Sequence, residues 1–463
     1  MRNTKREFCS YLIFDYRGVE AHLSKMAAKG WRLEKIGPWF WTYRRAEPAQ
    51  AAYAVTYLPS ASQYDPEPSE TRESLEELCA AAGWEPVAEW AQMQIFVNER
   101  PDPLPLETDE SVRLAAIHRS MKKGFLRWDA VMLVLALVMA GLQVRTLLTD
   151  PFHLLSSSSG LFSAALWDLL VILQTANLLG YWRWYRKSAQ SVAQGGPCAA
   201  AGRGLRLLNL IALWLVGICL VLYLAATAAT AESDQSVFMV CYLALFGLMV
   251  FLLDRIRRAL RRQGVSRRKN LAITLVMDVV LSVVLVGGLF TAYGILRFSG
   301  VLDRDGTYIY EHREWDTSPE PLPLTLEDLT GEAYPHVRRN RYGSGSFLVR
   351  EDHCWETVLD AADDGMSLDY TITTLALPSL RDLAAESILT EWTDRGYYDW
   401  VEADPAPWGA DAAYRQIFDD GWDRFLTGDY LLCWPDRVVE ISLTDLAPTP
   451  DQMAVIGEKL QNA

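Results

Sequence analysis

The sequence predicts a multi-domain membrane protein. Its core is an α-helical transmembrane bundle of about five helices. A small α+β cytoplasmic domain with a duplicated β-α-β-β unit and an α+β extracellular domain flank the bundle. Three observations support this class: five long apolar segments, positive charge in alternate connections, and a net charge of −14 for the whole chain that combines acidic flanking regions with a basic apolar region. The expected boundaries are 1–98 for the cytoplasmic domain, 99–126 for a linker with a juxtamembrane helix, 127–298 for the membrane region, and 299–463 for the acidic extracellular domain.

The cytoplasmic domain contains an internal repeat. Val19–Ile36 and Leu75–Trp90 each place a helix before a glycine, Gly30 or Gly83, and then a tryptophan that opens a strand. Glycine suits the left-handed position after a helix. The other expected strands are Phe8–Phe14, Trp39–Arg44, Tyr53–Leu58 and Met93–Asn98. Two copies predict one six-stranded antiparallel sheet with two helices on one face.

These two Gly-Trp corners carry a family resemblance. The runs MAAKGWRLEKI and LCAAAGWEPVAEW, with WFWTYRR and YAVTYL between them, resemble the bacterial family called domain of unknown function 2812. The resemblance covers about residues 7–100. Because that family pairs this soluble segment with downstream membrane helices and has no established activity, the resemblance implies a place beside a bacterial plasma membrane and implies no reaction.

Three aromatic residues, Trp39, Trp41 and Tyr43, fall on one face of a predicted strand, because strand side chains alternate. They could bind a flat ligand or a partner peptide, or they could pack under the two helices. After the repeat, Asn98–Glu110 is rich in proline and is expected to act as a semi-rigid spacer. A basic juxtamembrane helix, about Ser111–Arg127, is expected next.

Five apolar segments are long enough to cross a hydrocarbon core of about 30 Å. They are Trp128–Leu148, Leu161–Trp182, Leu207–Ala229, Val237–Leu253 and Leu271–Arg297. Lys and Arg gather before the first segment, between the second and third, and between the fourth and fifth, which predicts that these connections are cytoplasmic. The N-terminus lacks the long apolar run of a signal peptide. We therefore expect a cytoplasmic N-terminus and an extracellular C-terminus.

The connection between the fourth and fifth segments is the most basic part of the chain. It either binds anionic headgroups of the lipid bilayer or serves only to set the topology. Its candidate residues are Arg257, Arg258, Arg261, Arg262, Arg267, Arg268 and Lys269.

Two acids, Asp168 and Asp278, lie within apolar segments. Acids at such depth are candidates for ion or proton binding because their burial is costly. The alternative is that they form hydrogen bonds between helices.

The extracellular domain is predicted to be α+β. A helix follows Ser379, Tyr430–Trp434 and Val438–Leu443 form a hairpin, and a last helix starts at Thr449. Cys354 and Cys433 are the only cysteines here, and an oxidising location predicts a disulfide between them, with two buried thiols as the alternative.

Acidic clusters in this domain are expected to be solvated surface rather than calcium sites. The clusters are Asp360, Asp363 and Asp364, and Asp419, Asp420 and Asp423. The histidines show no zinc spacing, so we expect no metal site and no cofactor.

No nucleotide-binding loop, nucleophile elbow or kinase signature occurs in the sequence. The layout favours a non-enzymatic, membrane-embedded regulatory or sensory protein that links the extracellular domain to a cytoplasmic interaction domain. A cytosolic protein is the expected partner of residues 1–98, and nucleic acid is not. A transporter or transporter accessory subunit is the alternative, based on the two intramembrane acids. An outer-face enzyme is the second alternative.

Overall fold

The computed structural model describes residues 3–8, 11–37, 40–67, 69–90, 92–229, 233–298, 306–310, 313–317, 321–359, 364–393 and 396–463. The chain divides into two compact units. The N-terminal unit comprises Met1–Ala140, Leu166–Ile218 and Ala244–Gly287, and the C-terminal unit comprises Gly141–Ala165, Cys219–Leu243 and Gly288–Ala463. Both units contain parts of the long helices, and each unit is described by itself below.

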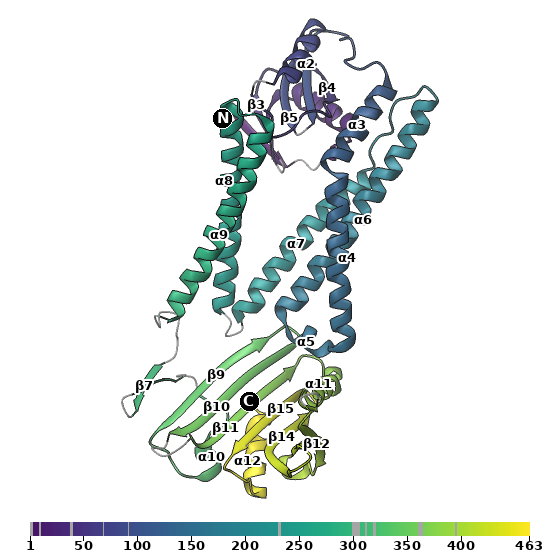
Figure 1. The fold of residues 1–463 in the computed structure, drawn as a ribbon. Coiled ribbons are helices and arrows are strands. Elements are labelled where there is room, and N and C mark those ends of the chain that lie inside the picture. Colours follow the sequence, from purple (N-terminus) through teal and green to yellow (C-terminus); the bar gives the residue numbers. More distant parts are fainter. Residues whose placement is uncertain are drawn as a thin grey trace. The chain divides into compact units, whose positions relative to one another are not determined.

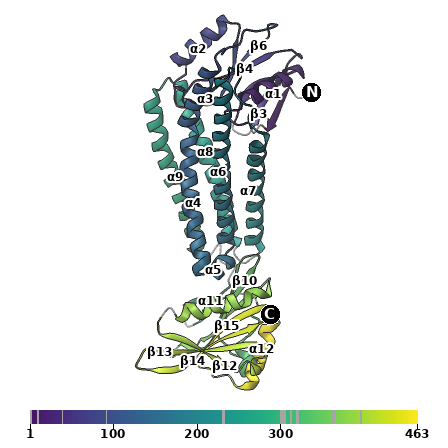
Figure 2. The same ribbon diagram turned by 90° about the vertical axis from the view of Figure 1, so that its right-hand side faces the viewer.

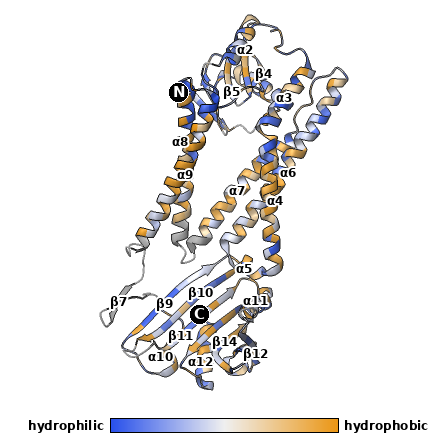
Figure 3. Ribbon diagram, viewed as in Figure 1, coloured by the Kyte–Doolittle hydropathy of each residue, from blue (hydrophilic) through white to orange (hydrophobic). Residues whose placement is uncertain are grey.

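Five helices in the described part of the chain are long and apolar enough to cross a membrane. They are α4 (Leu126–Thr149), α6 (Ser158–Ala193), α7 (Arg203–Ala229), α8 (Ser233–Arg262) and α9 (Arg267–Phe298). Each of the five predicted segments lies inside one of them, and apolar residues run along their length (Figure 3). Many of these side chains are exposed in the protein alone, as expected for helices that face lipid.

The predicted order of strands and helices in the β-α-β-β repeat is confirmed, but the prediction of a first strand at Phe8–Phe14 is wrong, since that strand is Thr4–Phe8 and residues 11–15 form a turn before the first helix. The first copy is β1 (Thr4–Phe8), α1 (Tyr16–Ala28), β2 (Trp31–Ile36) and β3 (Phe40–Arg45). The second copy is β4 (Ala52–Tyr57), α2 (Glu70–Ala81), β5 (Glu85–Trp90) and β6 (Met93–Asn98). Gly30 and Gly83 end the two helices with φ angles of 77° and 82°, which only glycine adopts easily.

The prediction of one six-stranded sheet is wrong. The repeat forms two three-stranded sheets, ordered β1-β3-β2 and β4-β6-β5, whose edge strands β2 and β5 lie next to each other. Both edge strands contain a bulge at the equivalent place, between Leu33 and Lys35 and between Pro86 and Ala88. A bulge disrupts ladder pairing, and Pro86 has no N–H to donate. Arg32 bridges the two copies instead, with Nη2 3.5 Å from Glu85 Oε2.

The segment after the repeat, predicted to be a spacer, is mostly exposed but contacts the second copy of the repeat. The carbonyl of Leu104 accepts a hydrogen bond from Trp84 Nε1 at 2.8 Å. Helix α3 (Glu110–Gly124) then buries Leu114, Ile117 and Met121 in the main core of the N-terminal unit. These apolar residues recur at helical spacing, so one face of α3 belongs to the core. The basic residues of α3 occupy its other faces.

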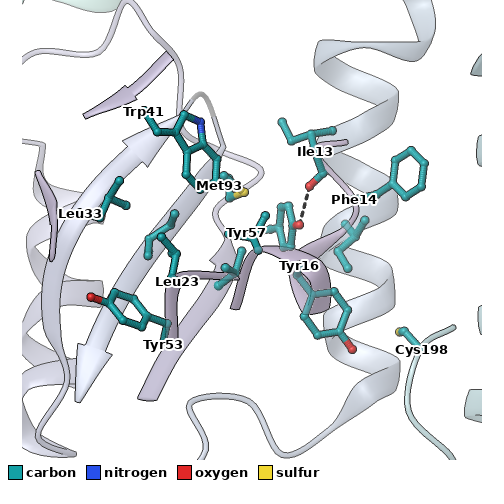
Figure 4. Close-up of a cluster of buried hydrophobic side chains, with 14 of the residues drawn as sticks. Ile13, Phe14, Tyr16, Leu23, Leu33, Trp41, Tyr53, Tyr57, Met93 and Cys198 are labelled. Atoms are coloured by element: carbon teal, nitrogen blue, oxygen red, sulfur yellow. Dashed lines mark hydrogen bonds between the residues drawn. The ribbon is translucent and has the colours of Figure 1, made fainter. Parts of the chain in front are cut away.

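The same core contains most of the predicted aromatic strip. Trp41 is 2% exposed and Tyr43 is fully buried, and both belong to the same hydrophobic core as Leu23 of α1. Figure 4 shows Trp41 and Leu23 in this core. The packing alternative is therefore confirmed for these two residues. Trp39 lies outside the described residues.

The C-terminal unit is built on a seven-stranded antiparallel sheet in the order β12-β13-β14-β15-β11-β10-β9. The strands are β9 (Val337–Gly345), β10 (Val349–Leu359), β11 (Asp364–Leu375), β12 (Tyr398–Ala403), β13 (Ala412–Asp419), β14 (Arg424–Trp434) and β15 (Arg437–Thr444). A separate hairpin joins β7 (Gly306–Tyr310) to β8 (Arg313–Thr317). The predicted hairpin is thus β14–β15.

Helices pack on both faces of this sheet (Figures 1 and 2). Helices α10 (Leu326–Thr330) and α12 (Pro450–Gln461) cover one face, and α11 (Arg381–Thr393) and α5 (Pro151–Ser156) cover part of the other. Helix α5 belongs to the connection between α4 and α6. Ser346 Oγ donates to Leu155 O at 2.6 Å and ties this connection to the sheet.

The predicted disulfide is wrong for this fold, because Cys354 and Cys433 are free, buried thiols. Strands β11 and β15 separate β10 from β14, so three strand spacings of about 4.8 Å lie between the two residues. A disulfide needs Cα atoms within about 7 Å. The residues also face opposite sides of the sheet, in different core clusters. Burial raises the pKa of each thiol to about 11.

Candidate functional site

The basic connection between α8 and α9 contacts the repeat domain directly. Arg261 is the centre of the contact: its Nη2 lies 2.9 Å from Glu67 Oε1 and 2.9 Å from Glu89 Oε1. Its Nε donates to Asp65 O at 3.1 Å, and its own carbonyl accepts from Glu67 N at 2.9 Å. Only 16% of the side chain is exposed. The residue therefore joins the β4–α2 loop, β5 and the end of α8.

Three neighbours of Arg261 hold the same loop. Asn270 is fully buried and its Nδ2 donates to Tyr64 O at 3.1 Å. Arg267 Nη1 donates to Ser60 O at 3.2 Å. Arg257 Nη1 donates to Gln63 Oε1 at 2.5 Å. We call this set of contacts the polar junction. It joins Leu58–Ser69 and Glu89 on one side to the α8–α9 connection on the other.

A cavity of about 1230 Å³ opens beside the polar junction. Its helix wall changes character along α8, from Gly247, Val250 and Phe251 to arginines. Lining residues from the predicted sites are Arg257, Arg258, Arg261, Arg262 and Asp278. Of the other predicted residues, Arg267, Arg268, Lys269 and Asp168 do not line it, so the two intramembrane acids do not meet here.

Most charges on the cavity wall are paired. Asp254 contacts Arg257 at 2.5 Å and also pairs with Arg258. Glu89 is shared between Arg261 and Arg72, whose Nη1 lies 2.9 Å away. The sequence showed the basic half of this network but not its acidic partners, because Asp65, Glu67 and Glu89 reach it only through the fold. The one sequence signal for these partners was that they are acidic, as expected of residues that pair with a basic connection.

A second junction joins the repeat domain to the connection between α6 and α7. Cys198 is fully buried in the main core, and Phe14 packs its ring 4.9 Å from Trp184 and 5.3 Å from Tyr181 (Figure 4 labels Phe14 and Cys198). Trp184 Nε1 donates to Ala199 O at 2.8 Å. We call this the apolar junction, because its centre is a continuous hydrophobic core.

A few charged groups border the apolar junction. Glu110 Oε2 accepts from Cys198 N at 3.0 Å, and Arg17 Nη1 donates to Cys198 O at 3.3 Å. Burial acts to raise the pKa of Glu110, but the Cys198 hydrogen bond and Arg113 lower it below its ordinary value. Burial raises the pKa of Glu20 to about 7, although Val55 N donates to it at 2.9 Å. Burial also raises the pKa of the Cys198 thiol to about 12, so this cysteine is not a nucleophile at neutral pH.

In the part of the chain that the structure describes, no group of three or more His, Cys, Asp or Glu side chains could hold a metal ion. Of the predicted acidic clusters, Asp360 and Asp363 lie outside that part. In the other cluster, Asp420 accepts hydrogen bonds from the backbone N–H groups of Trp422 and Asp423, so it shapes a turn.

Comparison with known proteins finds one family. Residues 15–127 match the family described as "Protein of unknown function (DUF2812)". No curated protein and no solved structure matches the chain. The match runs from the start of α1 to the end of α3 and the first residues of α4, so it includes the helix that completes the core. The chain thus carries a domain of the DUF2812 family, joined directly to the first of its five candidate membrane helices.

Proposed function

We propose that this protein is a membrane-embedded regulatory protein. In it, the DUF2812-family domain responds to the position of helices α8 and α9 with their connection, which we call the α8–α9 hairpin. The observation that carries the proposal is that one domain is held at two junctions of opposite chemistry. The apolar junction centres on buried rings, and the polar junction consists of ion pairs and hydrogen bonds beside an open cavity.

The two junctions should differ in how easily they open. Separating Phe14 from Trp184 would expose apolar surface to water, and each Å² of that surface costs about 25 cal/mol of free energy. Opening the Arg261 contacts exchanges ion pairs for hydrated charges, and partly exposed ion pairs have a net worth of only about 0–1 kcal/mol each. The domain would therefore stay on the α6–α7 connection while the α8–α9 hairpin separates from it.

Separation would reach the rest of the domain through the residues that Arg261 holds. Glu89 belongs to β5, and Glu67 lies in the loop that leads into α2. Releasing both changes the surface formed by α2 and β5, and this surface is the proposed contact for a cytosolic protein partner. The proposal takes the N-terminus as cytoplasmic and the C-terminal domain as extracellular, supported by the basic α8–α9 connection.

Hydrogen–deuterium exchange on the full chain in lipid nanodiscs tests this coupling. Arg261→Glu opens the polar junction, and Arg268→Glu makes the same charge change outside the cavity. We expect faster exchange in 58–67 and also in α2 and β5 for Arg261→Glu alone, with α1 unchanged. If exchange in α2 and β5 stays at the wild-type rate while 58–67 opens, the domain does not follow the hairpin and the proposal fails.

A transporter or transporter accessory role is the second candidate, and one observation favours it: Asp278 lines the cavity. An acid at membrane depth beside a cavity suits the binding of a cation. Reconstituted vesicles that show a cation flux in the wild type and none in Asp278→Asn would support this role. Equal flux in both, or no flux in either, would contradict it.

A further inference from the structure

The cavity beside the polar junction is apolar at one end and cationic at the other, which matches an amphiphilic ligand. Along α8, the lining residues recur every three or four positions and so share one helix face. That face is apolar at Gly247, Val250 and Phe251 and cationic from Arg257 to Arg262. Val250 and Phe251 are 50% and 56% exposed, so in the structure no protein atoms cover them fully. An acyl chain fits the apolar end and an anionic headgroup fits the arginines.

The arginine end has free capacity for an anion. Arg261 is engaged by Glu67 and Glu89, and Arg257 and Arg258 share Asp254. Arg262 lines the cavity, is exposed, and forms no ion pair with any described residue. A guanidinium binds a phosphate through two parallel hydrogen bonds. Arg262, with Arg258 about one helical turn away on the same face, provides such a site.

The facing wall limits the charge of the headgroup. It belongs to the DUF2812-family domain and carries more carboxylates than cationic groups: Glu34, Asp65, Glu67, Glu73, Glu76 and Glu89, against Lys35 and Arg72. Glu73 is exposed and has no ion pair among the described residues. A headgroup with a second negative charge would be repelled here. An ammonium group would be attracted.

We infer that the cavity binds a phospholipid whose headgroup carries one phosphate and one primary ammonium group. Arg262 and Arg258 hold the phosphate, Glu73 accepts from the ammonium, and the Gly247–Phe251 face of α8 receives an acyl chain. Thr274, Leu275 and Asp278 line the cavity from the other helix, α9. The site adjoins the polar junction, but its existence does not depend on the regulatory role proposed above.

Native mass spectrometry of the full chain from nanodiscs with equal parts of phosphatidylethanolamine, phosphatidylcholine and phosphatidylglycerol tests the inference. We expect retention of phosphatidylethanolamine above both others. Arg262→Gln should reduce it about fivefold, since a cationic residue near a membrane surface contributes about that factor. Arg268→Gln, the matched control outside the cavity, should not.

The ammonium contact has its own control pair. Glu73→Gln should abolish the preference for phosphatidylethanolamine over phosphatidylcholine, while Glu77→Gln, on the same helix outside the cavity, should preserve it. A preference for phosphatidylglycerol, no preference at all, or equal losses in the variants and their controls would overturn the inference. Unchanged hydrogen exchange of α1 in each variant shows that the domain remains folded. If lipid selectivity fails but the Arg261→Glu coupling persists, only this inference falls.

Discussion

The two junctions of the DUF2812-family domain use the same kind of structural element, a short connection between two long helices, and different chemistry. The α6–α7 connection enters the hydrophobic core through Cys198 and the end of α6 through Trp184. The α8–α9 connection contributes Arg261 and Asn270 to a polar network over a cavity. A domain held by two cores would be rigid, and one held by two polar networks would detach. One apolar junction and one polar junction together would keep the domain in place and leave the polar contact able to change.

Truncating the apolar junction should have the largest effect. Trp184→Ala removes a side chain that is 5% exposed and packed against Phe14. Loss of a buried tryptophan costs about 3–5 kcal/mol. We expect the free energy of opening of α1 and β4, measured by hydrogen exchange in nanodiscs, to fall by that amount. Trp182→Ala, at a residue that is 51% exposed on the same helix, should change it little. Equal effects of the two variants would show that this junction is not a core.

Breaking the polar junction should cost less and should depend on salt. Arg261→Ala leaves Glu67 and Glu89 without their shared partner and should cost about 2 kcal/mol in the stability of the loop contact. About 1 M salt should weaken the wild-type contact and narrow the difference from the variant, because salt screens exposed charges. Exchange rates in 58–67 provide the measurement, with Arg268→Ala as control. A salt-independent cost would mean that packing, and not charge, holds this junction.

The sequence predicted best what depends on local pattern. The five apolar runs predict five helices whatever their neighbours are. Gly30 and Gly83 end helices because glycine adopts a positive φ easily. The split into two three-stranded sheets was not predicted, because the alternation of residue types predicts strands but does not determine which strands pair across the repeat. The burial of α3 could have been found. Leu114, Ile117 and Met121 recur at helical spacing, which is typical of a helix with one face in a core.

The candidate site was predicted only in half. Arg257 to Lys269 stand out as a basic run, but their partners in the β4–α2 loop and β5 are unremarkable acids in sequence. The prediction of a disulfide was wrong for a similar reason. An even cysteine count says nothing about which strands lie between Cys354 and Cys433. Pairings across the fold depend on strand order, and local pattern does not determine strand order.

Titration of Glu20 should separate the two junctions by pH. Burial raises its pKa from 4.5 to about 7, so the folded domain binds the proton more tightly than the unfolded chain. The domain is therefore favoured below pH 4.5 and loses this stability as pH rises to about 7. Glu20→Gln should raise the stability at pH 8 by about 2 kcal/mol and leave it nearly unchanged at pH 4.

The Glu20 effect should be seen at α1 and β4, near the apolar junction, because Arg113, Glu110 and Arg17 are the charged groups that act on this carboxyl. Melting curves of wild type and Glu20→Gln between pH 4 and 8 would measure it. A parallel shift of both proteins with pH would contradict the assignment. So would a change confined to 58–67, since Glu20 makes no contact in the polar junction.

The smallest effect is expected for Arg257→Ala, and it tests whether the polar junction has a centre. Arg257 donates to Gln63 and pairs with Asp254, which keeps Arg258 as a partner when Arg257 is removed. Its side chain is 25% exposed, so its contribution should be about 0.5 kcal/mol, measured by exchange in 58–67. A cost equal to that of Arg261→Ala would mean that the whole basic connection acts as a diffuse positive field. A much smaller cost places the contact energy at Arg261, where two carboxylates and two backbone groups converge on one residue.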